Sequence, residues 1–347
     1  MDLLKSTIEK ITVLDAAAMD EAQKRLDFLL KPQGSLGKLE AIAKQLAGIT
    51  GKTINKIEGK SILVMAGDNG VIEEKVSSFP KEVSKLVAET MITGLSGVAV
   101  LGKFAGANIK VVDLGLDADI ENPAIINRKI KRGTGNIAKG PAMTREEAIK
   151  AIETGIEITN QTIDEGVNLI GTGEVGIANT TTSSAVLYAL TGENIDLLVG
   201  RGAGLSDEGL AIKKSAIKKA VELNKPDVSD PVDVISKVGG FDIAGMTGCF
   251  LACAARKVPV VIDGFISGVA ALCAVRIKSE SGLYMIQSHG TEEPGGKIIH
   301  KLLGVEPMLM MNMRLGEGTG CALAFNIVEA ATKMMSDMGT FADIGMA

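Results

Sequence analysis

Along the chain, short apolar segments alternate with amphipathic stretches and with loops that are rich in glycine. Apolar residues at helical spacing predict N-terminal helices at 16–30 and 36–46, with a Pro- and Gly-containing break between them. Compact apolar runs predict strands at 61–66, 108–114, 167–171, 196–199, 258–263 and 284–288. Further helices are predicted at 81–104, 145–165, 182–191, 208–223, 241–255, 265–277 and 320–337.

The order strand, loop, helix recurs many times, which is typical of a mostly parallel sheet with helices on both faces. We therefore predict an α/β fold. The longest apolar run, 258–275, contains Asp263 and two glycines, so a buried strand followed by a buried helix explains it better than a membrane span. We expect the methionine-rich stretch 308–313 in the core, with a pocket wall as the alternative.

Composition narrows the function classes. The net charge is −5 and there is no basic tail, which argues against nucleic-acid binding. The N-terminal residues lack a basic stretch followed by an apolar one, so we expect no signal peptide and a cytoplasmic protein. The cysteines lack the partners of a zinc site, so we expect no metal and interpret them as buried free thiols: Cys249, Cys253, Cys273 and Cys321.

The loops that follow the predicted strands are rich in Gly, Asp, Glu and Asn. They include 67–70, 171–180, 200–204, 263–265 and 314–320. Glycine allows the backbone to approach an anion closely, and amides at the start of the next helix can then bind it. One such loop is most simply a tight turn, but several together indicate a phosphorylated ligand.

Glu174 and Glu317 stand beside glycines in two of these loops. A carboxylate in a closed pocket can act as a general base, since burial raises its pKa toward neutrality. An acid that stabilises a helix N-terminus is the alternative interpretation, and the spacing does not decide between them. The chain lacks the G-x-G-x-x-G dinucleotide fingerprint, a Walker lysine and the G-x-S-x-G elbow of serine hydrolases.

Five motifs together resemble the nicotinate-nucleotide:dimethylbenzimidazole phosphoribosyltransferase family. They are KPQGSLGKLE at 31–40, AGDxGV at 66–71, GExGIxNTT at 173–181, VGRGxGL at 199–205 and MRLGEGTG at 313–320. The motifs occur in the family order between about residues 25 and 325.

The resemblance implies a Rossmann-like sheet domain with a small helical domain. We divide the chain into an N-terminal helical segment of the small domain at 1–58, a catalytic domain at 59–320 and a C-terminal helix at 321–347. Family members are homodimers that need no cofactor. In their reaction, a base attacks C1′ of nicotinate mononucleotide, nicotinate leaves, and an α-ribotide of a cobamide lower ligand forms.

The resemblance also implies residue roles. Glu317 matches the glutamate that takes the proton of the incoming base, and Glu174 matches a second, assisting glutamate. The expected nucleotide- and phosphate-binding residues are Gly176, Asn179, Thr180, Gly202, Gly204, Lys213, Thr291 and Gly318. The expected base-binding residues are Ser78, Phe79, Ser84, Leu86 and Leu315.

The sequence departs from the family pattern around the expected base pocket. Asn69 replaces a histidine, Phe79 a tyrosine, Leu86 a glutamine and Val87 a methionine, while Thr291 and Gly296 replace a serine and a histidine. Changing the polar groups of a pocket changes what it accepts. The expected acceptor is dimethylbenzimidazole, adenine or a phenolic base such as phenol or p-cresol. A heterodimer with a related chain, with this chain as its non-catalytic subunit, is the alternative to a catalytic homodimer.

Overall fold

The computed structural model describes residues 3–346 and places a six-stranded parallel sheet at the centre of the protein. The strands are β1 (Lys60–Gly67), β2 (Asn108–Gly115), β3 (Ile126–Asn127), β4 (Leu169–Val175), β5 (Val260–Ile262) and β6 (Met285–Gln287). Their order in the sheet is β3-β2-β1-β4-β5-β6, and every pair is parallel. The direction of winding reverses between β1 and β4, which opens a crevice at their carboxyl ends.

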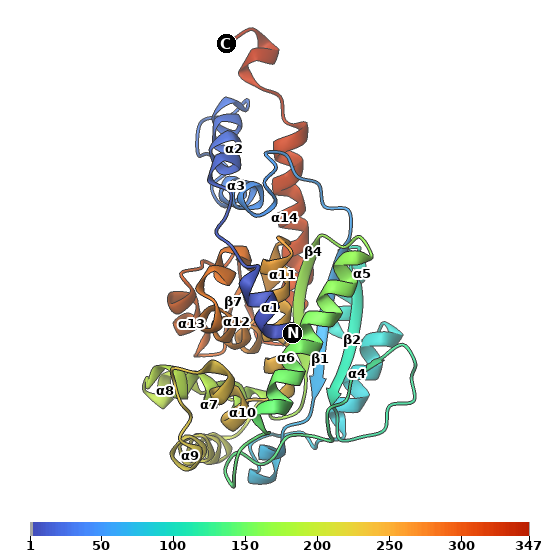
Figure 1. Ribbon diagram of the computed structural model, residues 1–347, viewed down its shortest axis with the longest axis vertical. Helices are drawn as coiled ribbons and strands as arrows, with labels where there is room; N and C mark the ends of the chain where they lie inside the picture. Colours follow the sequence, from blue (N-terminus) through green and yellow to red (C-terminus); the bar gives the residue numbers. More distant parts are fainter. Residues whose placement is uncertain (1–2, 347) are drawn as a thin grey trace.

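Helices cover both faces of this sheet (Figure 1). The helices that precede β4 are α1 (Leu3–Glu9), α2 (Ala16–Phe28), α3 (Lys38–Thr50), α4 (Val83–Thr93), α5 (Gly97–Phe104) and α6 (Arg145–Asp164). Those between β4 and β5 are α7 (Asn179–Thr191), α8 (Ile195–Leu198), α9 (Asp207–Asn224), α10 (Pro231–Val238) and α11 (Phe241–Ala255). The remaining helices are α12 (Phe265–Ile277), α13 (Gly296–Leu303) and α14 (Thr319–Asp337). Helices α11 and α12 contact one face of the sheet, and α4, α5 and α14 contact the other.

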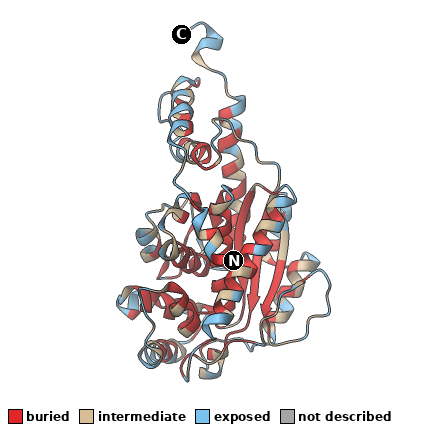
Figure 2. Ribbon diagram, viewed as in Figure 1, coloured by how far each residue is buried: buried red, intermediate tan, exposed pale blue. Residues whose placement is uncertain are grey.

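Alternate residues of the central strand enter two separate cores. Leu63 and Met65 of β1 pack in the core beneath α11, whereas Ile62, Val64 and Ala66 pack in the core beneath α14. All five side chains are fully buried. A parallel strand that is covered on both faces appears in the sequence as a continuous apolar run, which explains why the run at 61–66 predicts β1. Figure 2 shows how far the strands of this sheet are buried.

Helices α2 and α3 form a lobe beyond one end of the sheet, and α14 runs from the sheet into this lobe (Figure 1). Helix α14 has 19 residues and is therefore about 28 Å long. Helix α1 lies elsewhere, against α6 and α11 on the main body. The described part of the expected N-terminal segment, residues 3–58, is thus shared between the lobe and the main body.

Three sequence-based expectations are wrong. The expected strand at 196–199 is helix α8, because the Asn194 side chain accepts a hydrogen bond from the Asp196 amide and starts a helical turn. The expected helix at 81–104 is two helices, because Gly94 ends α4 in the left-handed conformation and Ser96 caps α5. The stretch 308–313 is not core, because strand β8 (Leu309–Met313) pairs with β7 (His289–Thr291) and leaves Met310 75% exposed.

The segment Val83–Phe104 is long and apolar enough to cross a membrane by length and composition alone. In the fold it supplies α4 and α5, with 11 and 8 residues. Both helices contact β2, and neither reaches the roughly 30 Å of a hydrocarbon core. Its buried apolar residues, including Ala88, Met91 and Val98, pack in the core on this face of the sheet.

Candidate active site

A cavity of about 580 Å³ lies at the carboxyl ends of β4 and β5, beside the point where the strand order reverses. Its wall includes the loop from β4 to α7, the loop at 201–203, the start of α12, and the segment 314–317 before α14. These are the loops in which the sequence concentrates glycine and acidic residues. The site is therefore where a doubly wound sheet ordinarily binds its ligand.

The segment Gly316-Glu317-Gly318 has an unusual backbone. Its φ angles are 87°, 64° and 99°, so three consecutive residues lie in the left-handed region. Glycine adopts this region freely, whereas a glutamate there is strained by about 1–3 kcal/mol, and such strain is concentrated at functional sites. The two glycines thus allow this backbone conformation, which places Glu317 at the cavity wall.

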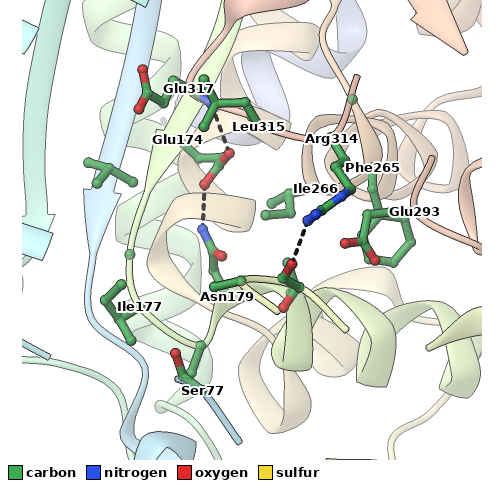
Figure 3. Close-up of a pocket in the computed structure, with 18 of the residues that line it drawn as sticks. Ser77, Glu174, Ile177, Asn179, Phe265, Ile266, Glu293, Arg314, Leu315 and Glu317 are labelled. Atoms are coloured by element: carbon green, nitrogen blue, oxygen red, sulfur yellow. Dashed lines mark hydrogen bonds between the residues drawn. The ribbon is translucent and has the colours of Figure 1, made fainter. Parts of the chain in front are cut away.

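Close packing of β4 against this segment explains two of the glycines. A Cβ atom on Gly173 would lie 2.2 Å from the backbone oxygen of Glu317. A Cβ atom on Gly316 would lie 2.4 Å from Oε1 of Glu174. The Glu317 amide donates a hydrogen bond of 3.2 Å to the same Oε1 (Figure 3). Glu174 therefore holds the loop that carries Glu317.

Glu174 is a buried carboxyl group whose pKa is raised to about 8. Burial is the largest cause, and the neighbouring carboxyl groups of Asp242 and Asp263 raise it further. The Asn179 side chain donates a hydrogen bond to Oε2 and acts in the opposite direction (Figure 3). At neutral pH the site thus contains a protonated carboxyl group that an approaching cation could ionise.

Asp263 and Asp242 complete this acidic group, and we did not expect either residue from the sequence. Burial raises the pKa of Asp263 to about 7 and that of Asp242 to about 6. Asp263 accepts hydrogen bonds from the amides of Gly318 at 3.1 Å and Gly320 at 2.6 Å. It thereby fixes the start of α14 behind Glu317. An aspartate that directly follows a buried strand was the sequence signal that could have identified Asp263.

Glu317 lies at the edge of the acidic group and is only partly buried. Its Oε2 accepts a hydrogen bond of 3.0 Å from the amide of Val98, in the first turn of α5. Figure 3 shows the side chain extending away from the carboxyl group of Glu174. The two glutamates therefore differ in their surroundings: Glu317 is bound by an amide at a helix N-terminus, whereas Glu174 is enclosed beside other acidic side chains.

The opposite end of the cavity is built for an anion. Lys213 is fully buried, and its Nζ donates hydrogen bonds to Oγ1 of Thr180 at 2.8 Å and to the oxygen of Gly200 at 3.1 Å. Burial lowers the pKa of Lys213 to about 8, while the charge of Glu293 opposes this shift. The Arg314 side chain donates a hydrogen bond of 3.0 Å to the oxygen of Gly202. Two cations thus flank the glycine loop and the N-terminus of α7.

Glu293 and Arg314 belong to this end, although neither was among the expected site residues. Glu293 is 7% exposed, and its Oε2 lacks a hydrogen-bond partner among the described residues. Burial raises its pKa, and the charges of Lys213 and Arg314 lower it. The available signals were a charged residue two positions after the expected Thr291 and another at the start of the 314–320 loop.

The third part of the wall is apolar. It is formed by a set of mostly β-branched side chains from the segment before α4, from α4 itself, and from the loops after β4 and β8: Val76, Phe79, Val83, Val87, Val175, Ile177 and Leu315. Phe79 is 49% exposed and Leu315 is 61% exposed, which places both at the open side. Such a wall suits a flat aromatic ring.

The expected site residues are divided between the wall and its surroundings. Those in the wall are Glu174, Glu317, Gly176, Asn179, Thr180, Gly202, Thr291, Phe79 and Leu315. Those outside it are Gly204, Lys213, Gly318, Ser78, Ser84 and Leu86.

The six outside the wall differ in their surroundings. Lys213 acts from behind Thr180, and the amide of Gly318 is bound to Asp263. Leu86 is 58% exposed. Ser84 is fully buried away from the wall, so the helical register of α4 directs its neighbours Val83 and Val87 to the cavity instead.

The substitution at Asn69 also lies outside the wall. Asn69 is buried, accepts a hydrogen bond from the Thr182 hydroxyl at 3.1 Å and donates to the oxygens of Gly67 and Ile177. It therefore joins the ends of β1 and β4. Within residues 3–346, no three His, Cys, Asp or Glu side chains are grouped so as to hold a metal ion. The four cysteines are buried and free.

Comparison with known proteins agrees with this geometry. A family model described as a phosphoribosyltransferase matches residues 11–346. The chain is 56% identical over 339 residues to the nicotinate-nucleotide–dimethylbenzimidazole phosphoribosyltransferase of Ruminiclostridium cellulolyticum, with 98% of this chain and 96% of the relative covered. It is 52% identical over 341 residues to the protein of the same name from Acetivibrio thermocellus, with 98% and 97% covered.

A solved structure shows the same fold. It is the crystal structure of the nicotinate-nucleotide-dimethylbenzimidazole phosphoribosyltransferase of Thermus thermophilus, with a TM-score of 0.91 and 32% sequence identity. The match covers 96% of this chain and 99% of that chain. Sequence, fold and site geometry agree, and the chain belongs to the nicotinate-nucleotide:dimethylbenzimidazole phosphoribosyltransferase family.

Proposed function

We propose that this chain transfers the phosphoribosyl group of nicotinate mononucleotide to dimethylbenzimidazole, with Glu317 as the proton acceptor. One observation carries the proposal: the strained loop at Glu317 lies between an anion-binding end and an apolar wall of the same cavity. A nucleotide has its phosphate at one end and its reacting C1′ about one ribose away. A cavity with this polarity therefore brings C1′ next to a base that lies on the apolar wall.

The phosphate end would bind the nucleotide through amides and buried charge. The start of α7 and Gly202 would let backbone amides come close to the phosphate, and Lys213 would supply positive charge from behind Thr180. A Cβ atom on Gly202 would lie 2.8 Å from Oγ1 of Thr180, so the loop leaves no space for a larger residue. Arg314 and Thr291 lie at the same end of the wall.

The acceptor base would lie against the apolar wall between Phe79 and Leu315. Dimethylbenzimidazole has an apolar, methylated edge that needs no hydrogen-bond partner there. Adenine would place an exocyclic amine and ring nitrogens against valine and isoleucine side chains, where they lose hydrogen bonds to water. This difference favours the benzimidazole.

In the reaction, a ring nitrogen of the base forms a bond to C1′ while the bond from C1′ to the nicotinate nitrogen breaks. The electron pair of that bond stays on the nicotinate nitrogen, so the pyridinium leaves as a neutral ring and needs no acid. The proton of the attacking benzimidazole passes to Glu317. Oε2 of Glu317 is bound to the Val98 amide, so we assign the proton to Oε1.

The buried carboxyl groups would stabilise the charge that develops during transfer. The pyridinium of the bound nucleotide is a cation, and positive charge moves to the ribose ring as its bond to nicotinate lengthens. Glu174 and Asp263 have pKa values of about 8 and about 7, so a nearby cation would ionise them readily. In a site that excludes water, a carboxylate next to the developing positive charge stabilises the transition state strongly.

We also propose that the enzyme is a cytoplasmic homodimer. Large apolar side chains are exposed at the surface, including Met310 at 75%, Leu95 at 77% and, at the cavity wall, Leu315 at 61%. A second copy of the chain would cover apolar surface of this kind. The buried free thiols fit a reducing compartment.

The test is turnover by the purified chain. Nicotinate mononucleotide is mixed with dimethylbenzimidazole, adenine, phenol or p-cresol, and the products are identified by mass spectrometry. We expect an α-ribotide and released nicotinate, with dimethylbenzimidazole giving the highest kcat/KM. If no base is consumed, the proposal fails; if a phenol is preferred, the transfer stands and the assignment of the base is wrong.

Two variants test the assignment of the proton acceptor. Glu317→Gln keeps the size of the side chain and removes its basicity, and we expect kcat to fall roughly 10²–10⁴-fold, the usual contribution of a general base. Glu193→Gln is the matched control, since Glu193 is an exposed glutamate in the turn after α7. Equal activity of the two variants would exclude Glu317 as the base.

A further inference from the structure

Ser84 has an environment that its expected role does not explain. It lies in the first turn of α4 and has no exposed surface, while Val83 and Val87 on the same helix line the cavity. Its hydroxyl donates a hydrogen bond to Oδ1 of Asp68 and accepts one of 2.9 Å from the amide of Ile177. One side chain thus connects α4 to the loops that follow β1 and β4.

Asp68 extends this connection to a third strand. It follows β1 directly, is 7% exposed, and its Oδ2 accepts a hydrogen bond of 2.8 Å from the amide of Asp117, just beyond β2. Burial raises the pKa of Asp68, and the hydrogen bonds from Ser84 and Asp117 oppose that shift. The ends of β1, β2 and β4 therefore converge on one carboxyl group and one hydroxyl group.

Another contact at the start of α4 lies at the surface, where Lys81 forms an ion pair with Asp117. The N-cap position of α4, Glu82, makes no side-chain capping hydrogen bond, and residues 78–82 are exposed. An exposed segment that leads into an uncapped helix is free to shift unless something anchors it. The Ser84 hydroxyl is a buried anchor that adjoins Val83 in the chain and binds the amide of Ile177, and both of these residues line the cavity.

We propose that Ser84 is a positioning residue that sets the width of the acceptor-base pocket by holding α4 against the loop after β4. This inference rests on the proposed transfer to an aromatic base. Ser84 acts through Val83, Val87 and Ile177, and it touches neither substrate. The chemistry requires a hydroxyl, because the group must donate to a carboxylate and accept from an amide at once. Without it, both buried partners lose their hydrogen bond.

The experiment compares Ser84→Thr with Ser84→Val in the full-length enzyme. The two side chains have nearly the same shape, so any crowding at this buried site is common to both, and only threonine keeps the hydroxyl. Steady-state kinetics give separate KM values for dimethylbenzimidazole and nicotinate mononucleotide. We expect Ser84→Val to raise the KM for the base at least fivefold and to change the KM for the nucleotide less than twofold. Ser84→Thr should stay within twofold of wild type for both.

Controls separate a failure of this inference from a failure of the proposed function. Wild-type turnover tests the function alone, before any variant is interpreted. Lys85→Ala changes the next residue of α4, whose side chain is partly exposed, and should leave both KM values unchanged. If Ser84→Val raises both KM values equally or behaves as Ser84→Thr does, the positioning role is refuted. Should Ser84→Val not fold, Asp68→Asn, which removes the acceptor charge, must show the same selective rise in the KM for the base.

Discussion

Replacing Glu174 by glutamine should stabilise the protein while it impairs catalysis. Native Glu174 has a pKa of about 8, whereas an ordinary glutamate has 4.5. Between these values the unfolded chain releases a proton that the folded protein keeps. The folded protein therefore binds more protons, and its stability falls as the pH rises through this window. Glutamine has the same shape and no proton to release, so Glu174→Gln avoids this loss.

The size of the effect follows from the shift. Each pKa unit corresponds to about 1.4 kcal/mol, so the burial of Glu174 costs at most about 5 kcal/mol once the pH exceeds 8. Coupling to Asp242 and Asp263 spreads part of this cost over three groups, and about 3 kcal/mol is our working figure. For a chain of this length, that figure corresponds to a rise in Tm of roughly 3–6 °C.

The assay is thermal unfolding of wild type and Glu174→Gln at pH 5, 7 and 8.5, with turnover measured on the same samples. The Tm difference should be small at pH 5 and should grow steadily toward pH 8.5, while kcat falls. A difference that is constant with pH would mean that the native pKa of Glu174 is not raised. A variant less stable than wild type at pH 8.5 would refute the electrostatic reasoning, because the carboxylate would then be favourably bound.

Three further results are expected. The pKa of Lys213 is about 8, so the KM for nicotinate mononucleotide should rise between pH 7 and 9.5 as this charge is lost, and Lys213→Met should abolish that dependence. Gly173→Ala places a methyl group 2.2 Å from the oxygen of Glu317, and should cost about 1–3 kcal/mol by urea denaturation together with most of the activity. Asp242→Asn removes a charge that raises the pKa of Glu174. In thermal unfolding at a series of pH values, the stability of this variant should therefore stop falling at a pH below 8, the value expected for wild type.

The sequence by itself determined the class of fold and most of the loops that form the site. Strands such as β1 are buried on both faces and therefore appear as uninterrupted apolar runs, which need no tertiary information to be recognised. The glycine-rich loop around Glu317 indicated a ligand site, and the structure adds that φ is positive at Glu317 and at the glycines on both sides of it. The family motifs added the reaction, because several of them are eight or more residues long and they occur together in the family order.

The sequence was less reliable where local signals compete. Residues 196–199 have the apolar pattern of a strand, yet the preceding Asn194 caps a helical turn. The methionine-rich stretch 308–313 was predicted to lie in the core. In the structure it supplies strand β8, which pairs with β7 in a two-stranded sheet outside the core. Hydrophobicity predicts that a side chain will be covered. It does not say whether this chain or another molecule covers it.

Only the tertiary structure decided which side chains meet. Motif position placed Ser84 and Leu86 at the base, but successive residues of a helix point about 100° apart, and the register of α4 turned Val83 and Val87 to the cavity. The acidic group of Glu174, Asp242 and Asp263 comes from β4, α11 and the end of β5, which are far apart in sequence. Burial is the largest cause of each raised pKa and neighbouring carboxyl groups add to it, and both depend on distances that only the folded sheet sets.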